Sequence, residues 1–189
     1  MRERVREIIL ESIQVKEGLL KDNISQILKL SELIIDSIRK GGKLIIFGNG
    51  GSAGDAQHIS AELIGRFKKD RPALAAISLT TNTSIITALA NDFGYDIIFA
   101  RQIEGLAGKN DVALGISTSG KAKNVTLGLK QARKMGLKTI ALTGCDGGEI
   151  AKIADISLIV SSNITARIQE AHILIGHIIC ELIEENIPA

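Results

Sequence analysis

The chain has 189 residues, of which 45% are hydrophobic and 23% charged, and its formal net charge is +2. This composition is ordinary for a globular protein and excludes a chain that is intrinsically disordered throughout. Acidic and basic residues are interspersed, Trp is absent, and only one Tyr and four Phe occur. The basic patch and the stacking aromatic side chains of nucleic-acid-binding proteins are therefore missing, and we expect no nucleic-acid partner.

The first residues and the cysteines bear on the compartment. The opening MRERVREIIL is charged from its second residue and lacks the apolar core of a signal peptide. No apolar stretch approaches the ~20 residues that a membrane helix needs. Cys145 and Cys180 fit no CxxC or zinc-finger spacing. We expect a cytoplasmic protein with reduced thiols and no membrane partner.

Residues 2–40 are predicted to form two helices. Apolar residues recur at helical intervals from Val5 to Ile13 and again from Ile24 to Ile35. Gly18 and residues 21–23 indicate a break between the helices, and the glycines at 41–42 end the second one. We expect this hairpin to take part in oligomer packing.

From residue 43 onward, short β-rich runs alternate with longer helical stretches. The expected strands are 43–48, 74–79, 112–117, 138–143 and 156–160, and the expected helices are 53–66, 83–107, 122–135 and 147–153. The strands are apolar nearly throughout, as parallel strands covered on both faces are. The alternation predicts an α/β fold with a doubly wound, five-stranded parallel sheet. We expect one domain over residues 1–189, with the hairpin at 1–40 and the α/β core at 41–189.

A last helix, predicted over residues 166–185, contains the segment AHILIGHIICELI. It is apolar almost all the way round, which predicts burial on most sides. A chain of this size has little room to bury this helix together with the hairpin. We therefore expect a homo-oligomer in which these helices pack between subunits.

Two loops have the composition of phosphate-binding turns. GNGGS at residues 48–52 follows the first predicted strand and precedes a helix, whose free N–H groups can bind an anion. A tight βα turn is the simpler interpretation, because the match to the dinucleotide fingerprint is weak: TTN at 80–82 stands where an acidic residue usually follows the second strand. A Walker loop is excluded because no GK[ST] occurs.

The second loop is STSG at residues 117–120, after the third predicted strand. Helix capping needs only one hydroxyl, so three in a row favour a sugar phosphate, with capping alone as the alternative. If the strand order is 2-1-3-4-5, both loops lie at the switch point where doubly wound sheets bind ligands. The sequence then predicts one ligand site built from both loops.

His58 and Glu62, four positions apart, share one face of a predicted helix. They are either a surface pair or a functional pair: two metal ligands, or a base with its partner. The other histidines, His172 and His177, lie on the last helix. On a helical wheel, Gln169 lies about 60° from His172 and about 80° from His177, so the wheel does not choose between them.

These segments occur together in one known family. The glycine loop, the His58–Glu62 pair, NDFG at 91–94, GISTSG at 115–120 and ARIQEAH at 166–172 resemble the sugar-isomerase (SIS) domain family along the whole chain. The resemblance is closest to the branch that converts sedoheptulose 7-phosphate to D-glycero-D-manno-heptose 7-phosphate, the first step of ADP/GDP-heptose biosynthesis for lipopolysaccharide. It implies a three-layer, flavodoxin-like fold, a homotetramer with active sites where subunits meet, and one zinc ion per subunit.

The resemblance also implies roles for individual residues. Glu62 matches the general base and His177 the general acid of an enediol mechanism, so the resemblance, not the wheel, selects His177 over His172. The implied zinc ligands are His58, Glu62, Gln169 and His177; a metal-bound glutamate is a weaker base, so the two roles of Glu62 oppose each other. The positions that match substrate contacts are Asn49, Gly50, Gly51, His58, Glu62, Asn91, Asp92, Ser117, Thr118, Ser119 and Gln169, with residues 117–119 at the phosphate.

Two features bear on function within the family. Ala122 stands where the phosphate loop usually has another serine, which removes a hydroxyl donor worth about 1 kcal/mol unless the charge of Lys121 replaces it. A non-catalytic branch, which binds the replication initiator DnaA, is similar along the whole chain but lacks the equivalents of Glu62 and His177. Their presence favours the enzyme. The alternatives are a regulator that binds DnaA or a phosphosugar, and an isomerase of hexose or pentose phosphates.

Overall fold

The computed structural model describes residues 1–187; residues 188–189 of the predicted domain lie outside the described part. One sheet of parallel strands has the order β2-β1-β3-β4-β5. The strands are β1 (Leu44–Gly48), β2 (Ala76–Ser78), β3 (Val112–Ser117), β4 (Lys138–Gly144) and β5 (Ile156–Val160). The predicted order and the parallel α/β fold are confirmed, and the central strands β1, β3 and β4 are buried at every position except Lys138.

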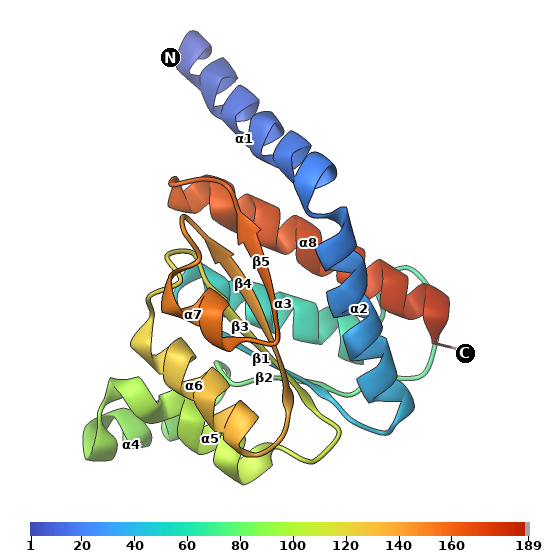
Figure 1. Cartoon of the computed structure of the whole chain (residues 1–189), viewed down its shortest axis with the longest axis vertical. Coiled ribbons are helices and arrows are strands. Elements are labelled where there is room, and N and C mark those ends of the chain that lie inside the picture. The colour runs from blue at the N-terminus through green and yellow to red at the C-terminus, as the bar shows by residue number, and fades with distance from the viewer. Residues whose placement is uncertain (188–189) are drawn as a thin grey trace.

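Helices cover both faces of the sheet (Figure 1). One face packs against α2 (Ile24–Arg39), α3 (Gly51–Ile64) and α8 (Thr165–Asn186), and the other against α5 (Ile98–Leu106), α6 (Lys123–Lys134) and α7 (Gly148–Ile153). Because successive strand residues point to opposite faces, Leu44 and Ile46 join the core beneath α8 while Ile45 and Phe47 join the core beneath α6. The three-layer arrangement brings α3 and α8 together on one side.

The two predicted N-terminal helices are present as α1 (Arg2–Asp22) and α2, and the chain bends between them at Asn23. They follow one another end to end and do not fold back side by side (Figure 1). Gly18 lies inside α1 and does not interrupt it, since one helical glycine costs only about 1 kcal/mol. Much of α1 extends beyond the rest of the molecule (Figure 1). Its apolar residues Val5, Ile9 and Ile13 are 57%, 54% and 45% exposed.

The single helix predicted over residues 83–107 is wrong. The segment forms α4 (Thr83–Phe93), a 3-10 turn (Tyr95–Ile97) and α5, with the break at Gly94. Gly94 has φ +89°, which glycine adopts far more readily than other residues and which a helix does not contain. No residue of α4 is buried, and the helix lies at the periphery of the molecule (Figure 1).

The predicted burial of the last helix is confirmed within a single chain. No residue from Arg167 to Glu184 is exposed, because α1, α2 and α3 all pack against α8. Covering α8 therefore does not itself require a second subunit. Across residues 1–187, no helix has both the length and the apolar surface to cross a bilayer.

Candidate active site

The two hydroxyl- and glycine-rich loops meet at one cavity of about 170 Å³. They are neighbours because β1 and β3 pair in register, with Gly48 opposite Ile116 at their carboxyl ends. The cavity carries polar groups from both loops and from α8, and only two of its lining residues are apolar. Its lining consists of Asn49, Ser52, Ile116, Ser117, Thr118, Ser119, Ala122 and Gln169.

The start of α3 is shaped to receive Gln169. Gly50 has φ +56°, and α3 begins at the next residue. A Cβ on Gly51 would collide with the side-chain amide of Gln169. Only glycine at 51 therefore leaves room for the side chain of Gln169 beside the first turn of α3, and the free N–H groups of such a turn can bind an anion.

The side chain of Asn49 connects the glycine loop to the start of α6 and to Tyr95. It exchanges hydrogen bonds with the amide of Asn124, at 2.8 and 2.9 Å, and accepts one at 3.1 Å from the hydroxyl of Tyr95. Asn124 is buried at the start of α6, and its oxygen also accepts from the N–H of Val125. Sequence analysis missed Asn124 and Tyr95, although both flank segments that it singled out.

Asn91 and Asp92, predicted to contact substrate, lie at the exposed end of α4 and bond to each other at 2.8 Å. Neither lines the cavity. Within one chain, Tyr95 is the residue that links this segment to the glycine loop. A substrate contact by Asn91 or Asp92 stays a prediction.

His58, Glu62 and His177 converge further along α3 and α8. Helix α3 places His58 and Glu62 one turn apart, with His58 Nε2 at 3.1 Å from Glu62 Oε1. His58 Nε2 is also 3.1 Å from His177 Nε2. The helices approach closely because α8 has a glycine, Gly176, where a Cβ would lie 2.7 Å from Ile59 of α3. Residues far apart in the chain thus form one cluster.

The cluster fits a divalent metal ion. One imidazole nitrogen serves one hydrogen bond, yet His58 Nε2 faces two partners. All three ligand atoms lie within 4.8 Å of one another. Zinc–nitrogen bonds of about 2.0–2.1 Å in tetrahedral geometry separate two ligand nitrogens by roughly 3.3 Å, close to the spacing found. Two imidazoles and a carboxylate with an open position are typical of catalytic zinc sites.

Gln169 does not join this cluster within one chain. It precedes His177 by eight residues on α8, or about 12 Å along the helix axis. Two ligands of one zinc ion lie no more than about 4 Å apart. The predicted fourth ligand therefore remains a prediction that requires Gln169 from another chain.

His172 has a different environment from His177. It is fully buried, and its Nε2 lies 3.1 Å from the backbone oxygen of Thr143 in β4. Burial lowers the pKa of His172 to about 4, although the bond to Thr143 opposes this. His172 is thus a neutral core residue that faces the sheet. The helical wheel did not choose between His172 and His177 as the site residue, and in the structure only His177 lies in the cluster with His58 and Glu62.

Asp55 is a further acidic group on the His58 face of α3. It precedes His58 by three residues, which places both side chains on one helix face, and its Oδ2 is buried without a hydrogen-bond partner. Burial raises the pKa of Asp55 to about 6, and the charge of His58 acts against this rise. Sequence analysis missed Asp55, although the i, i+3 spacing to His58 was readable.

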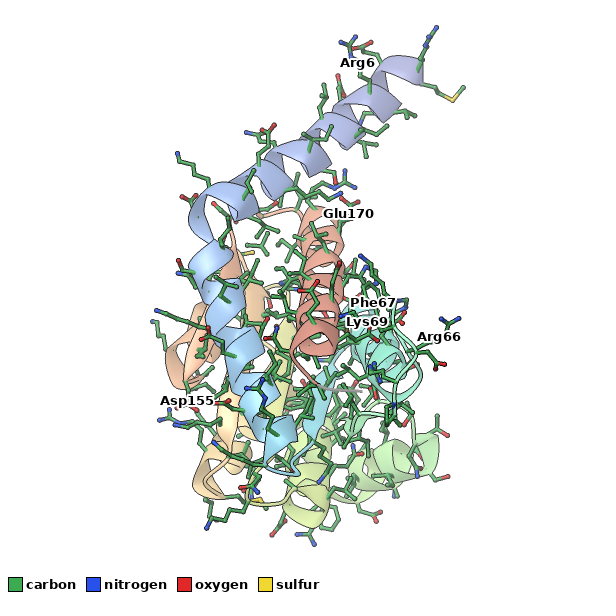
Figure 2. The ribbon with its side chains drawn as sticks, turned by 90° about the vertical axis from the view of Figure 1, so that its right-hand side faces the viewer. Arg6, Arg66, Phe67, Lys69, Asp155 and Glu170 are labelled. Atoms are coloured by element: carbon green, nitrogen blue, oxygen red, sulfur yellow. The ribbon has the colours of Figure 1, made fainter. Side chains whose placement is uncertain are left out.

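The segment after α3 packs against the cluster. The Phe67 ring stacks on His177, with centroids 5.3 Å apart and 27° between the planes. Figure 2 shows Phe67 and Lys69 beside α8, with Arg66 pointing away from it. The Glu184 carboxylate on α8 accepts from the N–H groups of Phe67, Lys68 and Lys69 at 2.8–3.0 Å.

Arg71 completes this arrangement. Its Nε donates to Glu184 at 3.0 Å, and its guanidinium donates to the backbone oxygens of Glu62 and Leu63 at 2.9 Å. These are carbonyls at the end of α3, which lack partners within the helix. Arg71 therefore joins the end of α3 to α8.

The acid stability of the protein is expected to depend on Glu184. Burial alone would raise its pKa, but the three N–H donors and Arg71 outweigh burial and lower the pKa to about 2, from an ordinary 4.5. The ionised form is thus stabilised by folding, and this contribution is complete above pH 4.5 and lost as pH falls toward 2. At pH 7, Glu184→Gln should lower the free energy of unfolding by about 3 kcal/mol, because Arg71 loses its buried partner.

Denaturant unfolding of both proteins between pH 7 and pH 2 measures this dependence. The difference between wild type and Glu184→Gln should stay constant down to about pH 5 and then shrink. A difference that does not change with pH would show that the charge of Glu184 contributes nothing.

Comparison with known proteins identifies the family. The profile of the SIS domain matches residues 9–144. The chain is 52% identical to phosphoheptose isomerase from Aquifex aeolicus over 187 residues, covering 99% of this chain and 98% of that one. The structure is similar to phosphoheptose isomerase GmhA from Neisseria gonorrhoeae, with a TM-score of 0.93 at 42% identity over 97% and 98% of the two chains. It is also similar to a phosphoheptose isomerase from Francisella tularensis, with a TM-score of 0.94 at 35% identity over 97% of each chain. The chain therefore belongs to the SIS domain family and, within it, to the phosphoheptose isomerases.

Proposed function

We propose that the protein isomerises sedoheptulose 7-phosphate to D-glycero-D-manno-heptose 7-phosphate in the cytoplasm, as the first step of heptose activation. The observation that carries this proposal is the convergence of Glu62 from α3 and His177 from α8 within 4.8 Å. An acid and a base so placed can move protons between two adjacent carbons and their oxygens. A DnaA-binding regulator has no use for that pair.

The chain's own groups account for the steps. The hydroxyls of residues 117–119 and the α3 N-terminus bind the phosphate. Glu62 takes the proton from the carbon next to the carbonyl, which leaves an enediol. His177 donates a proton to the carbonyl oxygen and takes one from the neighbouring hydroxyl. The proton on Glu62 exchanges with solvent during the lifetime of the enediol, Glu62 then protonates the other carbon, and the ketose has become an aldose.

We further propose that one zinc ion per subunit is held by His58, Glu62 and His177, with Gln169 as the fourth ligand from another chain. When bound, zinc supplies Lewis-acid polarisation of the sugar carbonyl. Two imidazoles favour zinc over magnesium or calcium, which prefer oxygen ligands.

A homotetramer with active sites between subunits is supported by two features. The outer part of α1 exposes apolar residues to solvent, as with Val5 and Ile9, and such surface is typical of interaction sites. Gln169 lines the phosphate cavity but lies about 12 Å along α8 from His177. A second chain that brings its Gln169 to the cluster brings its phosphate cavity as well. In this arrangement residues 1–189 act as one SIS domain whose N-terminal helices, within residues 1–40, pack between subunits.

A panel of phosphorylated ketoses tests the proposal. Purified protein is incubated with the 7-, 6- and 5-carbon ketose phosphates, and aldose formation is followed by chromatography. We expect turnover of sedoheptulose 7-phosphate to exceed the others. Turnover of only a hexose or pentose phosphate would reassign the substrate, whereas capture of DnaA without any turnover would favour the regulator.

Ala122→Ser should strengthen substrate binding. Ala122 lines the phosphate cavity, so a hydroxyl at this position adds a donor worth about 1 kcal/mol, or roughly a fivefold lower KM. The kcat should stay unchanged, because the proton transfers occur elsewhere. Lys121→Ala serves as the matched variant, and its KM should rise if the lysine charge replaces the missing hydroxyl. An unchanged KM in both variants would show that this side of the cavity does not contact the phosphate.

A further inference from the structure

The buried acid Glu184 lies on the same face of α8 as His177. The two residues are seven positions apart, about 10 Å along the axis and roughly 20° around it. The side chains of Glu184 and Arg71 are 1% and 3% exposed. Burying charges is costly unless they are paired and hydrogen-bonded. The buried carboxylate of Glu184 therefore depends on the hydrogen-bond donors that surround it.

Glu184 holds the segment after α3 by its backbone. Three successive N–H groups, of residues 67–69, converge on the two carboxylate oxygens, as backbone groups do around bound anions. Because these contacts are made by the backbone, they fix the path of the chain there. That path sets the Phe67 ring against the His177 imidazole.

Arg71 connects Glu184 of α8 to the end of α3. Its Nη2 donates to the backbone oxygen of Glu62, the proposed base, while its Nε bonds to Glu184. The ends of α3 and α8 are thus connected through one ion pair, which contacts the backbone of Glu62 in α3 and lies about two turns beyond His177 in α8.

We propose that Glu184 and Arg71 are positioning residues for the candidate active site: they hold Phe67 against His177 and fix the turn of α3 that carries Glu62. Neither residue need touch the substrate. The expected effect on kcat rests on the proposed function. The expected effect on metal affinity does not, because the same contacts set the geometry of the cluster formed by His58, Glu62 and His177. Outer residues that orient metal ligands typically change metal affinity or activity 10–100-fold.

The test compares Glu184→Gln with Glu181→Gln. Glu181 lies on the same helix and pairs with Lys68 of the same segment, at 2.6 Å, but both side chains are about half exposed. Its loss removes a surface ion pair and leaves the buried contacts intact. Phe67→Leu is the third variant, since it keeps apolar bulk but removes the ring from His177.

Two readouts separate positioning from stability. Co²⁺ is titrated into metal-free protein well below the unfolding temperature and followed by visible absorption. In addition, kcat and KM for sedoheptulose 7-phosphate are measured and normalised to the folded fraction from circular dichroism. We expect Glu184→Gln to weaken Co²⁺ binding and lower kcat roughly 10–100-fold, with KM within twofold. Phe67→Leu should lower the Co²⁺ affinity and kcat severalfold, whereas Glu181→Gln should change neither quantity.

Equal Co²⁺ affinity in wild type, Glu184→Gln and Glu181→Gln, including no binding in any of them, overturns the proposal. If Glu184→Gln does not fold, Phe67→Leu takes its place: a Co²⁺ affinity equal to that of the wild type and of Glu181→Gln then overturns the proposal. A wild-type protein that binds Co²⁺ but does not turn over the sugar removes the proposed function alone, and the positioning role is then judged on Co²⁺ affinity.

Discussion

Glu62→Gln and His177→Gln should each lower kcat for sedoheptulose 7-phosphate by about 10²–10⁴-fold, the usual contribution of a positioned acid or base. Glutamine has nearly the same size as either side chain but does not exchange protons near neutral pH. The double variant should be little slower than the single ones, because an acid and a base that act in one step are not additive. Steady-state rates, with folding checked by circular dichroism, measure these effects.

Glu181→Gln is the control for these substitutions, because it makes the same chemical change as Glu62→Gln and lies on the same helix as His177, in a half-exposed side chain. Its kcat should equal that of the wild type. If Glu62→Gln or His177→Gln is folded and retains near-wild-type turnover, the proposed acid–base pair is wrong.

Removal of metal should have the second large effect. After dialysis against a chelator, we expect activity to fall at least tenfold and to return with Zn²⁺ but not with Mg²⁺, because the ligand set contains two imidazoles. His58→Gln should weaken zinc binding to a similar extent. His58 has no proton-transfer role in the proposed steps, so excess Zn²⁺ should restore part of its activity.

Elemental analysis of protein purified without added metal completes this test. About one zinc per chain is expected. Full activity with far less than one metal ion per chain would remove the metal from the mechanism while leaving the acid–base pair in place.

The sheet was predictable because its strands are locally encoded. Each of the runs at 112–117 and 156–160 is apolar and bounded by polar or glycine residues, and both coincide with the observed strands. The candidate site at the ends of β1 and β3 followed from the composition of the two loops together with an assumed strand order, and the structure has that order. The helix predicted over 83–107 failed because a single glycine, Gly94, changes the backbone direction without interrupting the apolar pattern.

The contacts that shape the site could not be read from spacing. A wheel shows that His172 and His177 share a helix, but not that one faces β4 and the other α3. Glu184 looks like any acidic residue near a helix end; its role depends on the chain returning after α3, a contact across more than 110 residues. Tertiary contacts of this kind are absent from local periodicity.

The measurement that tests the account most directly is isomerisation in D₂O. Purified protein is incubated with sedoheptulose 7-phosphate, and the aldose is analysed by NMR and mass spectrometry. An enediol formed by Glu62 exchanges its proton with solvent, so we predict deuterium at C2 of the product in the wild type and a rate at least 100-fold lower in Glu62→Gln. Aldose without deuterium, or no aldose at all, would contradict the account.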